Sequence, residues 1–427
     1  MKGGSYLIEG ARIFDPTLGL DQVGDLIVHE GKIAGIGKGL KASDGYKRVV
    51  GRGKVLLPGF VDLHTHLREP GFEHKETVET GTRSAAAGGF TTICCMANTQ
   101  PVNDNAATTH YILEKAAQAC GVKVLPIGAI SKGLQGKELA EIGELKAAGC
   151  VGISDDGMTV MDSRLMRLAM DYAQGFGIPV LTHSVDANLA KGGSMHEGEV
   201  SCRLGLKGMP AEAEDIIVAR DIYLSRLTGA HLHVAHVSTA GSVELIRRAK
   251  QQGLKVSGEA APHHFTLTDA AVGDYDTHAK MCPPLRGEEH RQAVIAGLAD
   301  GTLDCIATDH APHATVDKEV EFDQAAFGIL GFETALPLAL RLVDGGKLTL
   351  QRLVESLTSA PLAILRRPYQ GIKVGAAADL ALLDLNAIWI YRASEGFSKS
   401  RNSPFEGWDM RGRVVGTWVD GKRVHGE

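Results

Sequence analysis

The chain has 427 residues, of which 44% are hydrophobic and 22% are charged, a balance typical of a globular protein with a large core. Its net charge of -6 offers no basic surface to a polyanion, so nucleic acid is not an expected partner. The seven cysteines are an odd number without a CxxC pair, which argues against a disulfide framework and against a cysteine zinc site.

The start of the chain does not resemble a secretory signal peptide, because Met1 to Glu9 lack a basic region followed by a long apolar stretch. No apolar run elsewhere approaches the ~20 residues that span a bilayer. We therefore expect a cytoplasmic protein without a membrane partner.

Both ends of the chain predict short β-strands separated by Gly, Asp and Pro. The candidates are Tyr6–Ile8, Ala11–Phe14, Asp25–His29, Lys32–Ile36, Ala378–Leu385 and Arg413–Val424. The last of these contains Val419-Asp420-Gly421-Lys422, a signal for a two-residue hairpin. We expect residues 1–58 and 370–427 to pair into one small β-sandwich domain.

Between these ends, apolar β-type runs alternate with helical stretches, which indicates βα units and a parallel sheet. The eight candidate strands are Gly59–His66, Thr91–Met96, Val122–Ile127, Gly152–Asp155, Pro179–His183, His231–His236, Lys255–Glu259 and Asp304–Thr308. The first and last begin about 245 residues apart, close to the ~250 residues of a (β/α)8 barrel. The fold class predicted for residues 59–369 is therefore an α/β TIM barrel.

Five of the eight predicted strands end in residue types that bind metals. These residues are His64 and His66 on the first strand, Asp156 after the fourth, His183 after the fifth, His236 after the sixth and Asp309 after the eighth. Residues i and i+2 of a strand point to the same side, so His64 and His66 can converge on one cation. The carboxyl ends of barrel strands form the active face. A lone His-x-His or Asp-His pair is often structural, but this combination in barrel order favours a metal centre.

Four imidazoles and two carboxylates suit Zn²⁺, and they can hold one or two ions, with two favoured because a carboxylate can bridge. Bound zinc lowers the pKa of its water to about 7 and polarises a carbonyl. We therefore predict a hydrolase in which metal-bound hydroxide attacks an amide. The sequence has no GxSxG, HExxH or GxxxxGK[ST] motif, so other common chemistries lack their signatures.

The first predicted strand resembles the opening motif of the dihydroorotases, a branch of the amidohydrolase superfamily. The matching residues are Pro58-Gly59-Phe60-Val61-Asp62-Leu63-His64-Thr65-His66-Leu67-Arg68-Glu69-Pro70-Gly71. The resemblance extends over essentially the whole chain, through Met96-Ala97-Asn98-Thr99, Ser154-Asp155-Asp156-Gly157, His183-Ser184, His196-Glu197-Gly198, His236-Val237-Ser238-Thr239 and Thr308-Asp309-His310-Ala311-Pro312-His313.

This resemblance implies roles for the six candidate ligands. His64 and His66 would bind one metal, His183 and His236 would bind the other, and Asp156 would bridge the two. Asp309 would ligate the first metal and act as the catalytic base. Related hydantoinases bridge their metals with a carboxylated lysine, whereas Asp156 at this place resembles the bacterial class I dihydroorotases.

The resemblance also implies the reaction, the reversible conversion of (S)-dihydroorotate and N-carbamoyl-L-aspartate in pyrimidine biosynthesis. Arg68 would clamp the substrate carboxylate with a bidentate fork, and it continues the two-residue alternation that begins at His64. The other substrate contacts implied are His66, Asn98, Cys282, His313, Phe327 and Gly328. Cys282 stands in Lys280-Met281-Cys282-Pro283-Pro284, where the family usually has Asn before the double proline.

Two alternatives stay open. The first is another cyclic amidohydrolase, an allantoinase or a dihydropyrimidinase (hydantoinase), whose uncharged ring needs no carboxylate clamp such as Arg68. The second is a non-catalytic, dihydroorotase-like scaffold of aspartate transcarbamoylase, which would lack metal ligands. A homodimer is the expected assembly, with a complex with aspartate transcarbamoylase as the other arrangement.

Overall fold

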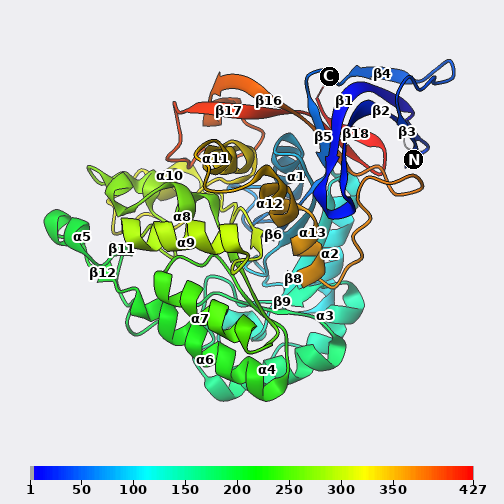
Figure 1. Ribbon diagram of the computed structural model, residues 1–427. Helices are drawn as coiled ribbons and strands as arrows, with labels where there is room; N and C mark the ends of the chain where they lie inside the picture. The colour runs from blue at the N-terminus through cyan, green and yellow to red at the C-terminus, as the bar shows by residue number, and fades with distance from the viewer. Residues whose placement is uncertain (1–3, 427) are drawn as a thin grey trace.

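Eight parallel strands form the centre of the molecule in the computed structural model, which describes residues 4–426 (Figure 1). They are β6 (Phe60–Thr65), β7 (Phe90–Cys95), β8 (Lys123–Gly128), β9 (Gly152–Ile153), β10 (Val180–Thr182), β13 (Leu232–Val234), β14 (Val256–Ala260) and β15 (Cys305–Ile306). Neighbours in the sheet follow this order, and a parallel bridge between Thr65 and His310 brings the last segment beside the first. The barrel is nearly closed, and the eight strands predicted from the sequence are confirmed.

Each barrel strand is followed by a helix that packs on the outside of the sheet (Figure 1). In strand order these helices are α1 (Val78–Ala87), α2 (Ala106–Gln118), α3 (Ile142–Ala148), α4 (Ser163–Phe176), α6 (Glu212–Thr228), α7 (Ala240–Gln251), α9 (Glu288–Asp300) and α11 (Phe332–Asp344), with α12 (Leu350–Leu357) and α13 (Ser359–Ile364) after the last.

The local sequence of α4 explains where this helix begins, what it buries and where it ends. The side chain of Asp162 accepts hydrogen bonds from the backbone N–H groups of Arg164 and Leu165, which satisfies donors that the first turn leaves free. Gly177, with φ of 68°, ends the helix in the left-handed conformation. The buried positions recur at helical spacing and form one face: Leu165, Met166, Ala169, Met170 and Ala173.

Short elements interrupt the longer connections at the rim of the barrel. They are β11 (Met195–His196), α5 (Glu199–Leu204) and β12 (Gly208–Met209) before α6, α8 (Pro262–Thr266) before α9, and α10 (Thr315–Lys318) before α11. Turns of 3₁₀ helix lie at Pro16–Leu18, Lys132–Leu134, Asp269–Val272, Thr277–Ala279 and Ala393–Glu395.

Strands from the two ends of the chain pair into a second, mostly antiparallel sheet beside the barrel (Figure 1). They are β1 (Tyr6–Asp15), β2 (Leu20–His29), β3 (Lys32–Gly37), β4 (Lys47–Val50), β5 (Val55–Pro58), β16 (Leu380–Ile390), β17 (Asp409–Val419) and β18 (Lys422–His425). The predicted hairpin is confirmed, since Val419 pairs with Lys422.

This second sheet has its own apolar core, and all of its strands hydrogen-bond into one sheet. Two predicted strands, Tyr6–Ile8 and Ala11–Phe14, are a single strand β1 with a bulge between Ile8 and Ala11. Trp418 is fully buried in the core, against the edge of the Tyr6 ring. The domain boundaries at residues 58/59 and 369/370 stay a prediction, and residues 1–3 and 427 of these ends lie outside the described residues.

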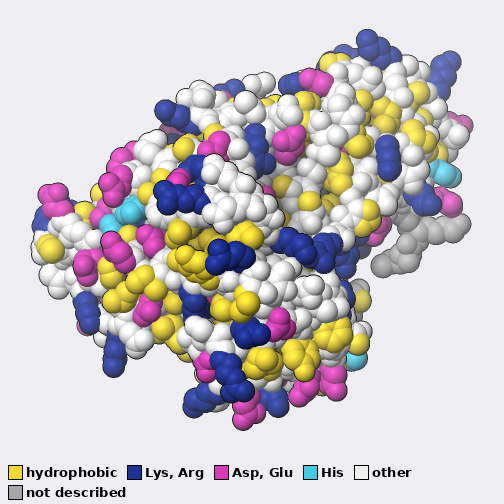
Figure 2. All heavy atoms as spheres, turned by 60° about the horizontal axis from the view of Figure 1, so that its bottom comes forward, with side chains coloured by type: hydrophobic (Ala, Val, Ile, Leu, Met, Phe, Trp, Pro, Cys, Tyr) yellow, Lys and Arg dark blue, Asp and Glu magenta, His cyan; other side chains and the backbone are white. Residues whose placement is uncertain are grey.

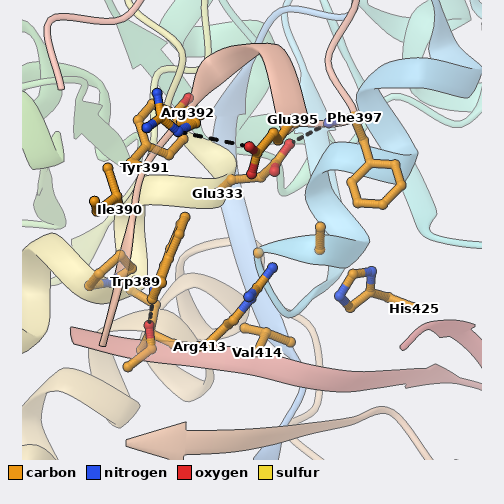
Figure 3. A pocket seen from close by; sticks show the side chains of 16 residues that line it. Glu333, Trp389, Ile390, Tyr391, Arg392, Glu395, Phe397, Arg413, Val414 and His425 are labelled. Carbon is orange, nitrogen blue, oxygen red and sulfur yellow. Dashed lines mark hydrogen bonds and ion pairs between the residues drawn. The ribbon is translucent and has the colours of Figure 1, made fainter. Parts of the chain in front are cut away.

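A pocket of about 300 Å³ lies where helices α1 and α11 of the barrel meet strands β16 and β17 of the second sheet (Figure 3). Two of its polar side chains, Glu333 and Trp389, form hydrogen bonds. Glu333 accepts hydrogen bonds from Ser84 and from the backbone N–H of Phe397, and the Trp389 indole donates to the backbone of Gly412. None of the predicted site residues lines this pocket. We interpret it as part of the packing between the barrel helices and the second sheet.

The surface in Figure 2 carries basic and acidic side chains spread over the same face. Large apolar side chains are exposed on the outer faces of two neighbouring helices. They are Leu168, Tyr172 and Phe176 on α4, and Ile216, Tyr223 and Leu227 on α6. No helix among residues 4–426 is long and apolar enough to cross a membrane.

Candidate metal centre

The six predicted metal ligands come from the carboxyl ends of five barrel strands. His64 lies in β6 and His66 directly follows it, whereas the others follow the ends of their strands: Asp156 after β9, His183 after β10, His236 after β13 and Asp309 after β15. Because the strands are parallel, these ends meet at one rim of the barrel. All six side chains are buried.

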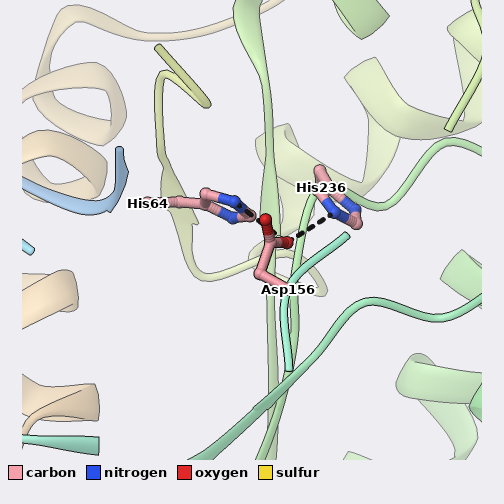
Figure 4. A group of neighbouring side chains, drawn as sticks. All are labelled: His64, Asp156 and His236. Carbon is pink, nitrogen blue, oxygen red and sulfur yellow. Dashed lines mark ion pairs between the residues drawn. The ribbon is translucent and has the colours of Figure 1, made fainter. Parts of the chain in front are cut away.

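Asp156 lies within 3.6 Å of all four histidines, and Figure 4 shows it between His64 and His236. Its Oδ1 atom lies 3.2 Å from Nε2 of His64, 3.5 Å from Nε2 of His236 and 3.6 Å from Nδ1 of His183. Its other oxygen, Oδ2, lies 3.4 Å from Nε2 of His66. One carboxylate therefore reaches both predicted ligand pairs, as a bridging ligand must.

Asp309 completes the cluster next to the first pair, His64 and His66. Its Oδ1 atom lies 3.1 Å from Nε2 of His66 and 3.5 Å from Nε2 of His64. The structure thus contains two overlapping triads with metal-ligand spacing, His64–Asp156–His236 and His64–His66–Asp309. It brings the six predicted ligands together, while their binding of metal stays a prediction.

Unsatisfied polar atoms show that this cluster suits a cation. Nε2 of His64, Oδ1 of Asp156 and Nδ1 of His236 are buried, and none of the described residues forms a hydrogen bond with them. Burying a polar atom without a partner costs free energy, and such atoms are uncommon in native structures. A divalent cation between the imidazole nitrogens and the carboxylate oxygens would satisfy Nε2 of His64 and Oδ1 of Asp156, whereas His236 offers the cluster its Nε2, 3.5 Å from Asp156.

The two carboxylates of the cluster stay ionised. Burial by itself raises the pKa of Asp156 and of Asp309, but the nearby histidines, His64 above all, outweigh it and hold both pKa values well below their usual range. Ionised carboxylates are the form that ligates metals.

The backbone is strained at the same rim. His236 and Asp309 have φ angles of 35° and 47°, and Arg68 has 61°, values that residues other than glycine rarely adopt. Such conformations persist where the surrounding structure holds them, and they cluster at functional sites. Here they turn two predicted ligands and the predicted clamp toward the barrel mouth.

Arg68 reaches the mouth by a different route from the one that the sequence suggested. Strand β6 ends at Thr65, so the two-residue alternation does not continue to Arg68, whose left-handed backbone aims it instead. Its Nε donates to the carbonyl of Pro312 at 3.1 Å, and Nη2 lies 3.3 Å from Nε2 of His313. Burial lowers the pKa of Arg68 to about 10, partly offset by Asp309, so the guanidinium stays charged.

The remaining predicted substrate residues surround the same opening. Asn98 accepts a hydrogen bond at 2.9 Å from Nδ1 of His66, which leaves Nε2 of His66 facing the carboxylates. Sγ of Cys282 lies 3.8 Å from Nε2 of His183.

The loop that carries Phe327 and Gly328 packs against His313. A Cβ atom on Gly328 would come within 2.6 Å of the His313 ring, so only glycine permits this approach. The Phe327 ring faces the ammonium group of Lys280 at 4.5 Å.

Comparison with known proteins identifies the family of this chain. Residues 53–242 match a family described as dihydro-orotase-like. Dihydroorotase from Anaeromyxobacter sp. (strain K) is 53% identical over 422 residues, which cover 98% of each chain. Dihydroorotase from Syntrophotalea carbinolica is 51% identical over 416 residues, covering 97% of this chain and 98% of that one. The chain belongs to the dihydroorotase family.

Solved structures that are similar in shape belong to a neighbouring branch. L-hydantoinase (dihydropyrimidinase) from Arthrobacter aurescens superposes with a TM-score of 0.88 at 26% identity, covering all of this chain and 97% of that one. D-hydantoinase from Thermus sp. gives a TM-score of 0.84 at 24% identity. The fold is therefore that of the cyclic amidohydrolases, and the much higher identity to dihydroorotases does not favour the hydantoinase alternative.

Two further residues of this dihydroorotase-family site were missed in the sequence. Asn402 accepts from the backbone N–H of His313 and donates to the carbonyls of Ala311 and Gly328, but it lies in the C-terminal segment without a motif around it. Glu259 accepts a hydrogen bond at 2.8 Å from Nδ1 of His64. A signal for Glu259 existed, since it ends the seventh predicted strand, as the ligands end theirs.

Proposed function

We propose that this protein is a dihydroorotase that opens the ring of dihydroorotate to N-carbamoyl-aspartate and closes it in the biosynthetic direction. The observation that carries the proposal is the position of Arg68, a half-buried cation next to His313 at the mouth of the six-residue cluster. A ring carboxylate needs such a cation, whereas the uncharged rings of hydantoin and allantoin do not. Relatives that are 51% and 53% identical to this chain over nearly its full length carry the name dihydroorotase.

The proposed metal is Zn²⁺, with two ions per chain favoured. His64, His66 and Asp309 would hold one ion, His183 and His236 the other, and Asp156 both. Imidazole nitrogens with carboxylates are a zinc ligand set. Ions in such a site polarise an amide carbonyl and lower the pKa of water.

The protein side chains supply the proton transfers and the orientation of the ring. Arg68 and His313 bind the ring carboxylate, which turns the scissile amide toward the metal cluster. Asp309 takes a proton from the attacking water at its carboxylate and delivers it to the ring nitrogen that departs. In the cyclising direction the same carboxylate removes the proton from the attacking nitrogen.

The proposed substrate is tested by turnover of dihydroorotate, hydantoin, dihydrouracil and allantoin on one preparation whose metal content is measured. We expect kcat/KM for dihydroorotate to exceed that of each uncharged ring by at least about 100-fold. An uncharged ring would leave the guanidinium of Arg68 without a carboxylate partner, and a site selects against such a substrate. Faster turnover of allantoin or dihydrouracil would favour the other cyclic amidohydrolases. A protein without metal and without activity on all four would be a scaffold.

Replacing Arg68 with Lys is expected to raise KM for dihydroorotate by about 10- to 100-fold, because lysine keeps the charge but loses the bidentate fork. Initial rates over a range of dihydroorotate concentrations measure this. Arg83→Lys is the matched control, since Arg83 is exposed on α1 and its guanidinium stacks 5.3 Å from the Phe397 ring. Equal KM values for Arg68→Lys and wild type would remove Arg68 from the carboxylate clamp.

The assembly and location of the protein are also proposals. A homodimer is the favoured assembly on general grounds, with a transcarbamoylase complex as the other arrangement, and the apolar side chains exposed on α4 and α6 offer a surface that a partner could cover. The two-domain division at residues 58/59 and 369/370, and a place in the cytoplasm, agree with the strand pairing and with the seven free cysteines.

A further inference from the structure

A series of hydrogen bonds, buried except at His231, runs from His64 through the inside of the barrel to its opposite end. Glu259 accepts from Nδ1 of His64 at 2.8 Å and, with its other oxygen, from Nε2 of His233 at 3.0 Å. Nδ1 of His233 lies 2.9 Å from Oγ of Ser257, which lies 2.9 Å from Nε2 of His231. The parallel pairing of β13 with β14 sets His233 beside Ser257 and so creates this series.

The hydrogen bonds at Glu259 have defined donors and acceptors. A carboxylate oxygen accepts, so the hydrogens lie on Nδ1 of His64 and on Nε2 of His233. The hydroxyl of Ser257 links the other nitrogen of His233 to Nε2 of His231. Nε2 is therefore the nitrogen of His64 that faces the cluster, 3.2 Å from Asp156.

Glu259 also holds a second predicted ligand. The same oxygen that binds His64 accepts from the backbone N–H of His236 at 3.2 Å, at the residue whose φ is 35°. Glu259 thus joins one ligand from each proposed metal.

We propose that Glu259 is a positioning residue of the metal centre, which fixes the tautomer of His64 and the backbone of His236, and that His233 holds Glu259 in place. This inference rests on the proposed metal centre. Partners that hold the second nitrogen of a ligating histidine set its orientation and basicity, and their loss typically weakens metal binding about 10- to 100-fold.

The test is the zinc affinity of the metal-free protein, measured by competition with a chromogenic chelator. In Glu259→Gln an amide N–H₂ replaces one acceptor oxygen, so we expect zinc to bind about 10- to 100-fold more weakly. Asp15→Asn is the control. Asp15 is a fully buried carboxylate at the end of β1 in the second sheet, where it accepts hydrogen bonds from the hydroxyl of Tyr369 and the backbone N–H of Ile372. This substitution is expected to lower stability to urea while keeping the zinc affinity of the wild type.

A second pair of variants decides the matter if Glu259→Gln does not fold. His233→Leu removes the donor to Glu259, whereas His233→Gln keeps an N–H near the position of Nε2. Only the leucine variant should therefore lose zinc affinity, by about tenfold. A folded Glu259→Gln that binds zinc as the wild type does would overturn the proposal, and so would equal affinities of the two His233 variants. Wild-type protein that binds no zinc would instead refute the metal centre itself.

Discussion

Replacing Asp309 with Asn is expected to lower the turnover of dihydroorotate by about 100- to 10,000-fold, the usual contribution of a positioned general base. The amide has the size of the carboxylate but accepts no proton at neutral pH. The group it replaces is buried, ionised and 3.1 Å from Nε2 of His66. The loss of ultraviolet absorbance of dihydroorotate measures the rate, and zinc is determined on the same sample.

The zinc content separates the two roles of Asp309. A full complement of zinc with slow turnover assigns the proton transfer to Asp309, whereas loss of zinc assigns it to ligation. Asp304→Asn is a matched control, because Asp304 precedes the same strand β15 at the other end of the barrel and binds Lys250. A variant at Asp309 with full zinc and the rate of the wild type would exclude it as the base.

The barrel was predictable because its strands are short apolar runs that the sequence separates with helical stretches. All six residues of β6 are buried, and such continuous burial is the pattern of strands covered on both faces. The ligands were predictable because parallel strands share one carboxyl edge, so that strand ends such as Asp156 and His236 must meet whatever their separation in the sequence.

Contacts set by loops and by strand register could not be predicted in this way. Arg68 was expected to follow the alternation of a strand, but the strand ends three residues earlier and a left-handed residue redirects the chain. Glu259 and His64 are 195 residues apart, and no local pattern records their hydrogen bond. Their contact depends on which strands face each other across the barrel, which only the closed structure defines.

Cys282, a predicted substrate contact, is another residue whose surroundings the sequence could not define. The sequence indicated only that it stands where the family usually has Asn. The structure places its sulfur 3.8 Å from His183, so it borders a predicted ligand of the second metal. A thiol is a weaker hydrogen-bond donor than an amide. We therefore predict that Cys282 binds the substrate ring more weakly than an Asn would at this position.

Removal of metal with a chelator is expected to reduce turnover to below about 1% of the untreated rate, because polarisation of the carbonyl and activation of water contribute several kcal/mol. The buried atoms of His64 and Asp156 without hydrogen-bond partners are the structural reason, since nothing in residues 4–426 replaces a cation there. Titration with Zn²⁺ should restore the rate, with a plateau at two equivalents per chain if both ligand pairs fill. A plateau at one equivalent would leave the pair of His183 and His236 without a metal. Protein verified as metal-free that retains full turnover would refute the metal centre, and a sample carried through the same steps without chelator controls for losses during handling.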